Sequence, residues 1–178
     1  MIDIKELFIV HYCHPNCEPF QNIMRLPKAE AFIKAKELAD KNPETQAFYR
    51  FADFENYYPR RLKSDEIIYN TFLSLGGKPK EKHPLSFVLN GSEYLNKWFG
   101  YGSIVKIPLI NIPSAQISFT YGDSSAMLEK TGEISLITKE MLLDEVVNYN
   151  GTLDEYMREV ENKYYYIEVQ LWSDNFIK

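Results

Sequence analysis

The sequence is poor in cysteine, in long apolar runs and in positive charge, and each shortage excludes a class of protein. Two cysteines in 178 residues are too few for a secreted disulfide scaffold and fit reduced thiols in a cytoplasm. No apolar run approaches the roughly 18 residues of a membrane span, and no signal-peptide core follows Met1. We therefore expect a cytoplasmic protein that makes no membrane contact. The net charge of −5 also argues against nucleic acid as a partner.

Linkers and repeats are lacking as well. No stretch rich in proline, glycine and serine divides the chain, and no segment recurs at a fixed period. Hydrophobic residues make up 45% and charged residues 25%, which is typical of a globular protein and not of a disordered one. Aromatic residues, at 15%, are the one excess, and they can serve a core or a stacking surface for a flat ligand. We expect one domain that spans residues 1–178.

The hydrophobic periodicity predicts helices and strands in mixed order. Helices are predicted at residues 27–41, 64–75, 92–99, 140–148 and 152–162. Strands are predicted at residues 7–12, 45–51, 85–89, 102–109, 116–121, 133–137 and 164–172. Because helices and strands do not alternate strictly, we expect an α+β fold rather than a doubly wound parallel sheet. The expected architecture is a mixed or mainly antiparallel sheet, split β-sandwich-like, with flanking helices.

Local signals set several of these boundaries. Ser64, followed by two acidic residues, has the form of a helix N-cap with acids in the first turn, so a helix is expected to begin there. Residues 53–61, which contain Pro59, are predicted to form a loop. The sequence Thr-Leu-Asp-Glu at 152–155 is a capping box that opens the last predicted helix.

Four possible metal ligands, His11, Cys13, His14 and Cys17, lie within seven residues. A structural zinc site normally takes its ligands from two separate turns, whereas His11 and Cys13 are expected on a strand and the other two in the loop that follows. The alternative is a pair of small buried thiols beside surface imidazoles. We predict that both cysteines are reduced and that no metal is bound.

Basic residues flank the helix predicted from residue 64. One cluster comprises Arg60, Arg61 and Lys63, and a second lies between residues 78 and 83. A guanidinium group binds phosphate in bidentate fashion, and a helix N-terminus beside it would add partial positive charge. A solvated surface is the alternative, because the acids at the helix start can satisfy the same amides.

Glu168 is the carboxylate that is most suggestive of function. It shares one face of the last predicted strand with Gln170, while three aliphatic residues occupy the other face. Since strands disfavour glutamate, its side chain either points into solvent or faces a cleft. No G-x-S-x-G motif is present, and residues 122–125 are predicted to form a turn, so the sequence does not support a serine hydrolase.

Three segments stand in a distinctive order along the chain. They are an aromatic strand with an arginine at residues 48–51 (Phe-Tyr-Arg-Phe), a strand entered through Ser86, and the late strand that carries Glu168. This order, over roughly residues 45–172, resembles the ADP-ribosyltransferase-like superfamily. Known members of that superfamily bind NAD in a split β-sandwich, with Arg or His on the first core strand, Ser or Tyr on the second and a catalytic Glu on a later one.

The resemblance implies that Glu168 and Ser86 are catalytic and that Arg50 binds the cofactor, NAD. We add to the NAD-binding set the side chains of Tyr49, Arg60 and Arg61. Cleavage of the bond between nicotinamide and ribose develops positive charge on the sugar, which a fixed carboxylate stabilises while a guanidinium holds the phosphates.

A second function remains open, namely a non-catalytic binding or regulatory module that acts on a protein partner through an aromatic-rich surface. The late strand of the superfamily usually reads Glu/Gln-x-Glu, whereas residues 168–170 read Glu-Val-Gln in this chain. The aromatic residues that we expect on such a surface are Tyr57, Tyr58, Tyr164 and Tyr165.

Overall fold

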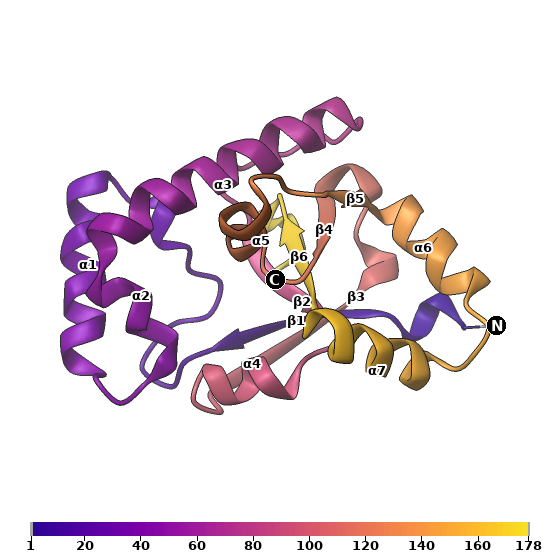
Figure 1. Ribbon diagram of the computed structural model, residues 1–178, viewed down its shortest axis with the longest axis horizontal. Coiled ribbons are helices and arrows are strands. Elements are labelled where there is room, and N and C mark those ends of the chain that lie inside the picture. Colours follow the sequence, from indigo (N-terminus) through magenta and orange to yellow (C-terminus); the bar gives the residue numbers. More distant parts are fainter. Residues whose placement is uncertain (1, 178) are drawn as a thin grey trace.

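The computed structural model describes residues 2–177 and has an α+β fold (Figure 1). Its strands are β1 (Phe8–Cys13), β2 (Leu85–Leu89), β3 (Ser103–Pro108), β4 (Ile117–Tyr121), β5 (Ile137–Thr138) and β6 (Ile167–Leu171). They form one antiparallel sheet in the order β3-β1-β2-β6-β4-β5. Its helices are α1 (Lys28–Lys41), α2 (Tyr49–Ala52), α3 (Phe54–Ser74), α4 (Glu93–Trp98), α5 (Ser124–Thr131), α6 (Lys139–Asn148) and α7 (Leu153–Tyr164). The predicted fold class, a mainly antiparallel sheet with flanking helices, is confirmed, whereas the expected split β-sandwich is not formed because the described strands all belong to one sheet.

The main core lies between one face of the sheet and helices α6 and α7. The aliphatic residues of β6 are fully buried against Leu142 and Val146 of α6 and Val160 of α7. The start of α7 is fixed by the predicted capping box, in which Thr152 and Glu155 each bond to the backbone of the other. Helical spacing thus correctly predicted which sides of α6 and α7 face the sheet.

The opposite face of the sheet is also covered, so β6 is buried on both sides. Helices α3 and α5 lie over this second face, and the ring of Trp172 stacks on Phe72 of α3 with centroids 5.7 Å apart. Glu168 and Gln170 therefore project into an interior layer instead of into solvent. This placement brings a carboxylate under the helices.

The strand predicted at residues 45–51 is not formed. Residues 46–48 make a 3-10 turn that continues into α2, with Phe48 buried against His14. Phe51 lies edge-on to Phe54 of α3, so packing between helices uses the rings that favour a strand in isolation. Tertiary contacts have overridden local β-propensity here.

Helix α3 begins at Phe54, ten residues before the predicted start, and runs through Pro59. A proline inside a helix costs about 3 kcal/mol, and burial of Phe54 and Tyr57 against α1 offsets this cost. Ser64 is a fully buried residue in mid-helix and caps nothing. The acid after it, Asp65, pairs with Arg61 one turn earlier instead of with helix-start amides.

Two other segments differ from the predictions. The strand predicted at 133–137 is reduced to β5, and the turn predicted at 122–125 includes the start of α5. Asp123 is the N-cap of α5 and accepts a hydrogen bond from the backbone N–H of Ala126. Within residues 2–177, no helix is both long and apolar enough to cross a membrane.

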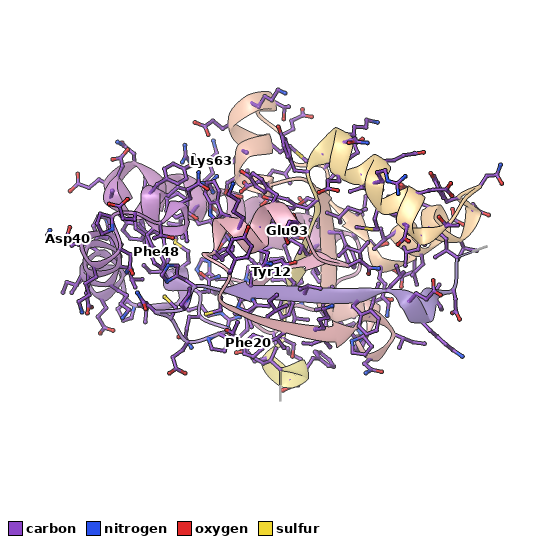
Figure 2. The ribbon with its side chains drawn as sticks, turned by 90° about the horizontal axis from the view of Figure 1, so that it is seen from below. Tyr12, Phe20, Asp40, Phe48, Lys63 and Glu93 are labelled. Atoms are coloured by element: carbon purple, nitrogen blue, oxygen red, sulfur yellow. The ribbon has the colours of Figure 1, made fainter. Side chains whose placement is uncertain are left out.

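The sheet opens between β1 and β2. In the part of the chain that the structure describes, these strands pair only at Ile9–Leu89 and Val10–Val88, whereas β1 stays paired with β3 along its whole length. Viewed from below, β1 crosses the molecule, and Tyr12 lies near Glu93 at the start of α4 (Figure 2). The Tyr12 hydroxyl accepts a hydrogen bond from the N–H of Ser92, which ties this end of β1 to α4.

Candidate functional site

A cavity of about 780 Å³ occupies the place where β1 and β2 separate. Such a volume is typical of small-molecule sites, which run from roughly 300 to 1,000 Å³. Its walls come from β1, β2, β6, the segment around α2 and α3, helix α4 and the start of α5. Four residues of the predicted site, Arg50, Arg61, Ser86 and Glu168, line this one cavity.

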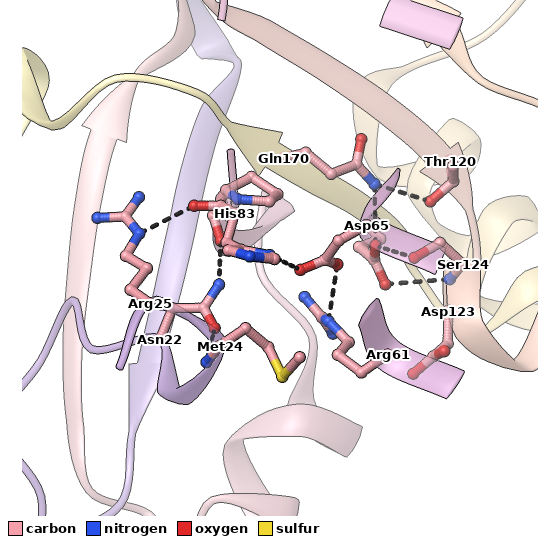
Figure 3. A network of polar contacts seen from close by, with 12 residues as sticks. Asn22, Met24, Arg25, Arg61, Asp65, His83, Thr120, Asp123, Ser124 and Gln170 are labelled. Carbon is pink, nitrogen blue, oxygen red and sulfur yellow. Dashed lines mark hydrogen bonds and ion pairs between the residues drawn. The ribbon is translucent and has the colours of Figure 1, made fainter. Parts of the chain in front are cut away.

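Glu168 is buried, with only 8% of its surface exposed, and its carboxylate accepts three hydrogen bonds. Its carboxylate accepts the N–H of Ser124 at 3.2 Å and the hydroxyl of Ser124 at 2.7 Å. The two residues that donate to it, Ser124 and Gln170, are labelled in Figure 3. The amide of Gln170 donates a third bond at 2.9 Å. A buried carboxylate with this many donors is fixed in one orientation.

The charge of Glu168 is subject to opposing influences. Burial, and after it the nearby carboxylate of Asp123, raise the pKa of Glu168 above its ordinary value. Arg61 and the hydrogen bonds from Gln170 and Ser124 oppose this rise without cancelling it. The net effect is a carboxylate that takes up a proton more readily than an exposed glutamate.

A chain of hydrogen bonds with a fixed direction ends at Glu168. The indole N–H of Trp172 can only donate, and it donates to the hydroxyl of Ser118 at 2.8 Å. Ser118 must then direct its own proton to Gln170 Oε1, at 2.9 Å. The amide nitrogen of Gln170 is left facing Thr120 and Glu168. The chain therefore always presents a donor to the carboxylate.

Arg61 brings a buried positive charge whose hydrogen-bonding capacity is unused. Its side chain is 14% exposed, and Nε lies 2.9 Å from Asp65 Oδ1. The N–H does not point at that oxygen, so the contact is an ion pair, and Arg61 makes no hydrogen bond to any residue in 2–177. Burial alone would lower the pKa of Arg61, but Asp65, followed by Tyr57 and Glu168, raises it overall. Arg61 is therefore a permanent cation in the cavity wall.

Arg50 supplies a second cation on the same side of the cavity. Its guanidinium donates to Asp123 at 3.3 Å and to the hydroxyl of Tyr49 at 3.0 Å, and it lies 5.7 Å from the centre of the Tyr57 ring. Burial lowers the pKa of Arg50, while Asp123 and then Tyr49 raise it above its ordinary value. Along this wall two acidic groups, Glu168 and Asp123, are thus followed by the basic group of Arg50.

Two residues of the predicted NAD-binding set lie elsewhere. Tyr49 is exposed and does not line the cavity, although its hydroxyl contacts Arg50. Arg60 points away and pairs with Glu129 at 2.9 Å on the surface. No helix begins beside Arg60, so the expected help of a helix N-terminus in binding phosphate is absent there.

No family model, curated protein or solved structure gives a significant match to this chain.

Several cavity residues were not predicted from the sequence. Asp123, and Ser124, which bonds to Glu168 without lining the cavity, were not recognised because residues 122–125 have the composition of a simple turn. A strand followed by Asp-Ser-Ser is also a helix-start signal, and that signal would have placed both side chains at the end of β4. Tyr166, Tyr94 and Trp98 line the cavity as well, and nothing in their local sequence indicates it.

His11 and His14 are both buried, which corrects the expectation of surface imidazoles. His11 Nδ1 lies 2.9 Å from the carbonyl oxygen of Ser86, and Nε2 accepts the N–H of Phe20 at 3.1 Å. Because a carbonyl only accepts and an amide N–H only donates, His11 is the neutral Nδ1–H tautomer. It bridges β1 and β2 beyond their last backbone pair and has no nitrogen left for a metal.

The two cysteines are free thiols that line the same cavity. Burial raises the pKa of both Cys13 and Cys17, and the Cys13 thiol donates to the carbonyl oxygen of Cys17 at 3.2 Å. Among the described residues, no group of three or more His, Cys, Asp or Glu side chains is arranged to hold a metal ion. Whether purified protein contains zinc remains the direct test of the predicted metal-free state.

Acid is expected to weaken the β1–β2 junction through His11. Burial lowers the pKa of His11, so the stability that its neutral form provides is complete above the ordinary histidine pKa of about 6.5. It is lost as the pH falls toward the lower pKa of the folded state, because only the unfolded chain gains the proton. Between pH 7.5 and pH 5.5, the free energy of unfolding measured with urea should therefore fall more for wild type than for His11→Phe. The contribution of His14 is the same in both proteins and cancels, and parallel pH dependences would contradict a lowered pKa of His11 in the folded state.

Proposed function

We propose that this protein is an NAD-binding, ADP-ribosyltransferase-like enzyme that cleaves the bond between nicotinamide and ribose. One observation carries the proposal: the buried carboxylate of Glu168 and the guanidinium of Arg61, which pairs with Asp65 but makes no hydrogen bond among residues 2–177, line the same cavity. NAD combines a cationic pyridinium ring with an anionic diphosphate, so it needs acidic and basic groups within one site. Glu168 and Asp123 suit the ring, and Arg61 and Arg50 suit the phosphates.

In the proposed reaction Glu168 stabilises the cationic sugar. As the bond between the ribose carbon and the ring nitrogen breaks, its electron pair passes to the nitrogen and nicotinamide leaves as a neutral molecule. A nucleophile, either water or an acceptor group, donates electrons to the sugar carbon and loses a proton. Ser86, whose hydroxyl is exposed in the cavity wall, is placed by the resemblance beside the ring or its ribose.

The alternative is a module that binds a nucleotide or a protein without catalysis. It is favoured by the order Glu168-Val169-Gln170, in which the acid comes first, and by exposed rings at the cavity mouth. Of the four tyrosines expected on such a surface, only Tyr165 is largely exposed, while Tyr57 is buried. This alternative predicts nucleotide binding with no release of nicotinamide.

Millimolar NAD should raise the melting temperature of the wild-type protein and should yield free nicotinamide, measured by chromatography. NADH is the matched control ligand, because it has the same phosphates but an uncharged dihydronicotinamide ring. We expect NADH to bind, since Arg50 and Arg61 can hold the same phosphates, and to release nothing, since its uncharged ring cannot leave as neutral nicotinamide. If NAD causes neither stabilisation nor nicotinamide release, the proposal is wrong. Stabilisation without release would favour the non-catalytic alternative.

A further inference from the structure

Four aromatic side chains border the cavity and contact one another. We call Tyr94, Trp98, Tyr165 and Tyr166 the aromatic rim. Tyr94 of α4 is at its centre, with ring centroids 5.9 Å from Trp98, 5.5 Å from Tyr165 and 6.5 Å from Tyr166. The three ring planes deviate from that of Tyr94 by 22° to 39°, so their faces point in similar directions. Tyr94 and Tyr165 are exposed and the other two rings are partly buried, and the exposed faces can accept a flat ring.

Tyr165 is held in place by neither burial nor backbone preference. It follows the last turn of α7 with φ at +71°, a region that a bulky side chain enters only at a cost. Glycine is the usual residue at such a position. The side chain of Tyr165 is nevertheless 66% exposed, so burial does not offset the backbone strain. Strain of this kind at a cavity mouth is typical of a residue that serves a ligand.

The rim is joined to the cationic wall of the cavity. Arg50 donates to the hydroxyl of Tyr49, and the Tyr49 ring meets Trp98 edge-on with centroids 5.5 Å apart. A ligand with phosphates at Arg50 and Arg61 would therefore have its next group beside Trp98. In a nucleotide a flat base is joined to the phosphates through a ribose, whereas an unmodified aromatic side chain of a protein carries no phosphate.

We propose that the aromatic rim stacks the adenine ring of the bound nucleotide. The inference rests on the proposed function for the identity of the ligand, and it assigns the end of NAD that Glu168 does not engage. The chemistry along the site then runs in the order of the ligand: carboxylates for the cationic ring, guanidinium groups for the diphosphate and exposed rings for the base.

The test uses ADP, which has the base and the phosphates but no nicotinamide. Binding is followed by tryptophan fluorescence, because Trp98 lies in the rim while Trp172 is fully buried under Phe72. Tyr165→Gly should weaken ADP binding about tenfold to hundredfold through loss of stacking. The same change should raise the melting temperature by roughly 2 to 8 °C, because it removes the strained backbone. Opposite effects on stability and affinity distinguish a ligand-binding role from a structural one.

Tyr101→Gly is the matched control. Tyr101 is also exposed, at 61%, and also has a positive φ of +54°, but it lies outside the cavity lining. Its replacement should stabilise the protein and leave ADP affinity unchanged. Tyr94→Ala, which removes the central ring without touching the strained position, should weaken ADP like Tyr165→Gly. Unchanged ADP affinity in both rim variants, or no quenching by ADP in wild type, would overturn the assignment.

The two proposals fail separately. If wild type binds ADP in a rim-dependent manner but releases no nicotinamide from NAD, the rim assignment stands and the enzymatic function falls. If nicotinamide is released at the wild-type rate by both rim variants and ADP affinity is unaltered, the function stands and the rim assignment falls.

Discussion

Replacement of Glu168 by glutamine is expected to abolish nicotinamide release while the fold and the binding of NAD persist. Glutamine keeps the length and shape of the side chain but removes the negative charge that, in the proposed reaction, stabilises the cationic sugar. A comparable loss of a single electrostatic contact in other enzymes lowers kcat on the order of 10²- to 10³-fold. The measurement is single-turnover release of nicotinamide at saturating NAD, beside the NAD-dependent shift in melting temperature. Glu66→Gln, an exposed carboxyl change on α3, should leave both unchanged.

The pH dependence gives a further check on the charge of Glu168. Because burial raises the pKa of Glu168, nicotinamide release should decline as the pH falls through that raised value. Stability should respond in the opposite sense. Wild type should be most stable relative to Glu168→Gln below the ordinary glutamate pKa of about 4.3, and should lose this advantage as the pH rises through the folded-state pKa. Equal turnover in wild type and Glu168→Gln would contradict the proposed enzymatic role of Glu168.

Periodicity in the sequence was sufficient to predict the helices and strands that bury one face. The strand at 85–89 and the helices at 27–41 and 152–162 show clean apolar spacing or a capping box, and each forms within two residues of its predicted ends. The region around α2 and α3 failed because its signals are ambiguous when considered locally. Pro59 can mark a loop or sit inside a helix, and only the packing of Phe54 and Tyr57 against α1 decides between them.

The candidate site was predicted in part and for a partly mistaken reason. The resemblance placed Arg50 on a core strand, yet Arg50 reaches the cavity from helix α2. Glu168 was inferred correctly to face away from the aliphatic side of β6, because alternation along a strand is a strict rule. The roles of Asp123 and the aromatic rim depend on how distant segments meet, and no local pattern encodes that meeting.

Arg61→Leu is expected to destabilise the protein by about 3 to 5 kcal/mol, because it leaves the carboxylate of Asp65 buried without its cation. Asp65 is only 1% exposed, and His83, whose Nδ1 lies 2.7 Å from its other oxygen, would remain its sole partner within residues 2–177. The same change should eliminate stabilisation by NAD, since a guanidinium of the cavity wall is lost. Urea unfolding and NAD titration measure the two effects.

Arg60→Leu is the control for Arg61→Leu, because the neighbouring arginine pairs with Glu129 on the surface and does not line the cavity. Its loss should change the unfolding free energy by about 1 kcal/mol or less and should leave NAD binding intact. The double variant Arg61→Leu/Asp65→Leu separates stability from binding, since it removes the orphaned charge. We expect it to regain much of the lost stability without regaining affinity for NAD. If NAD stabilised the double variant as it does wild type, Arg61 would be a structural cation and the phosphates would have to bind elsewhere.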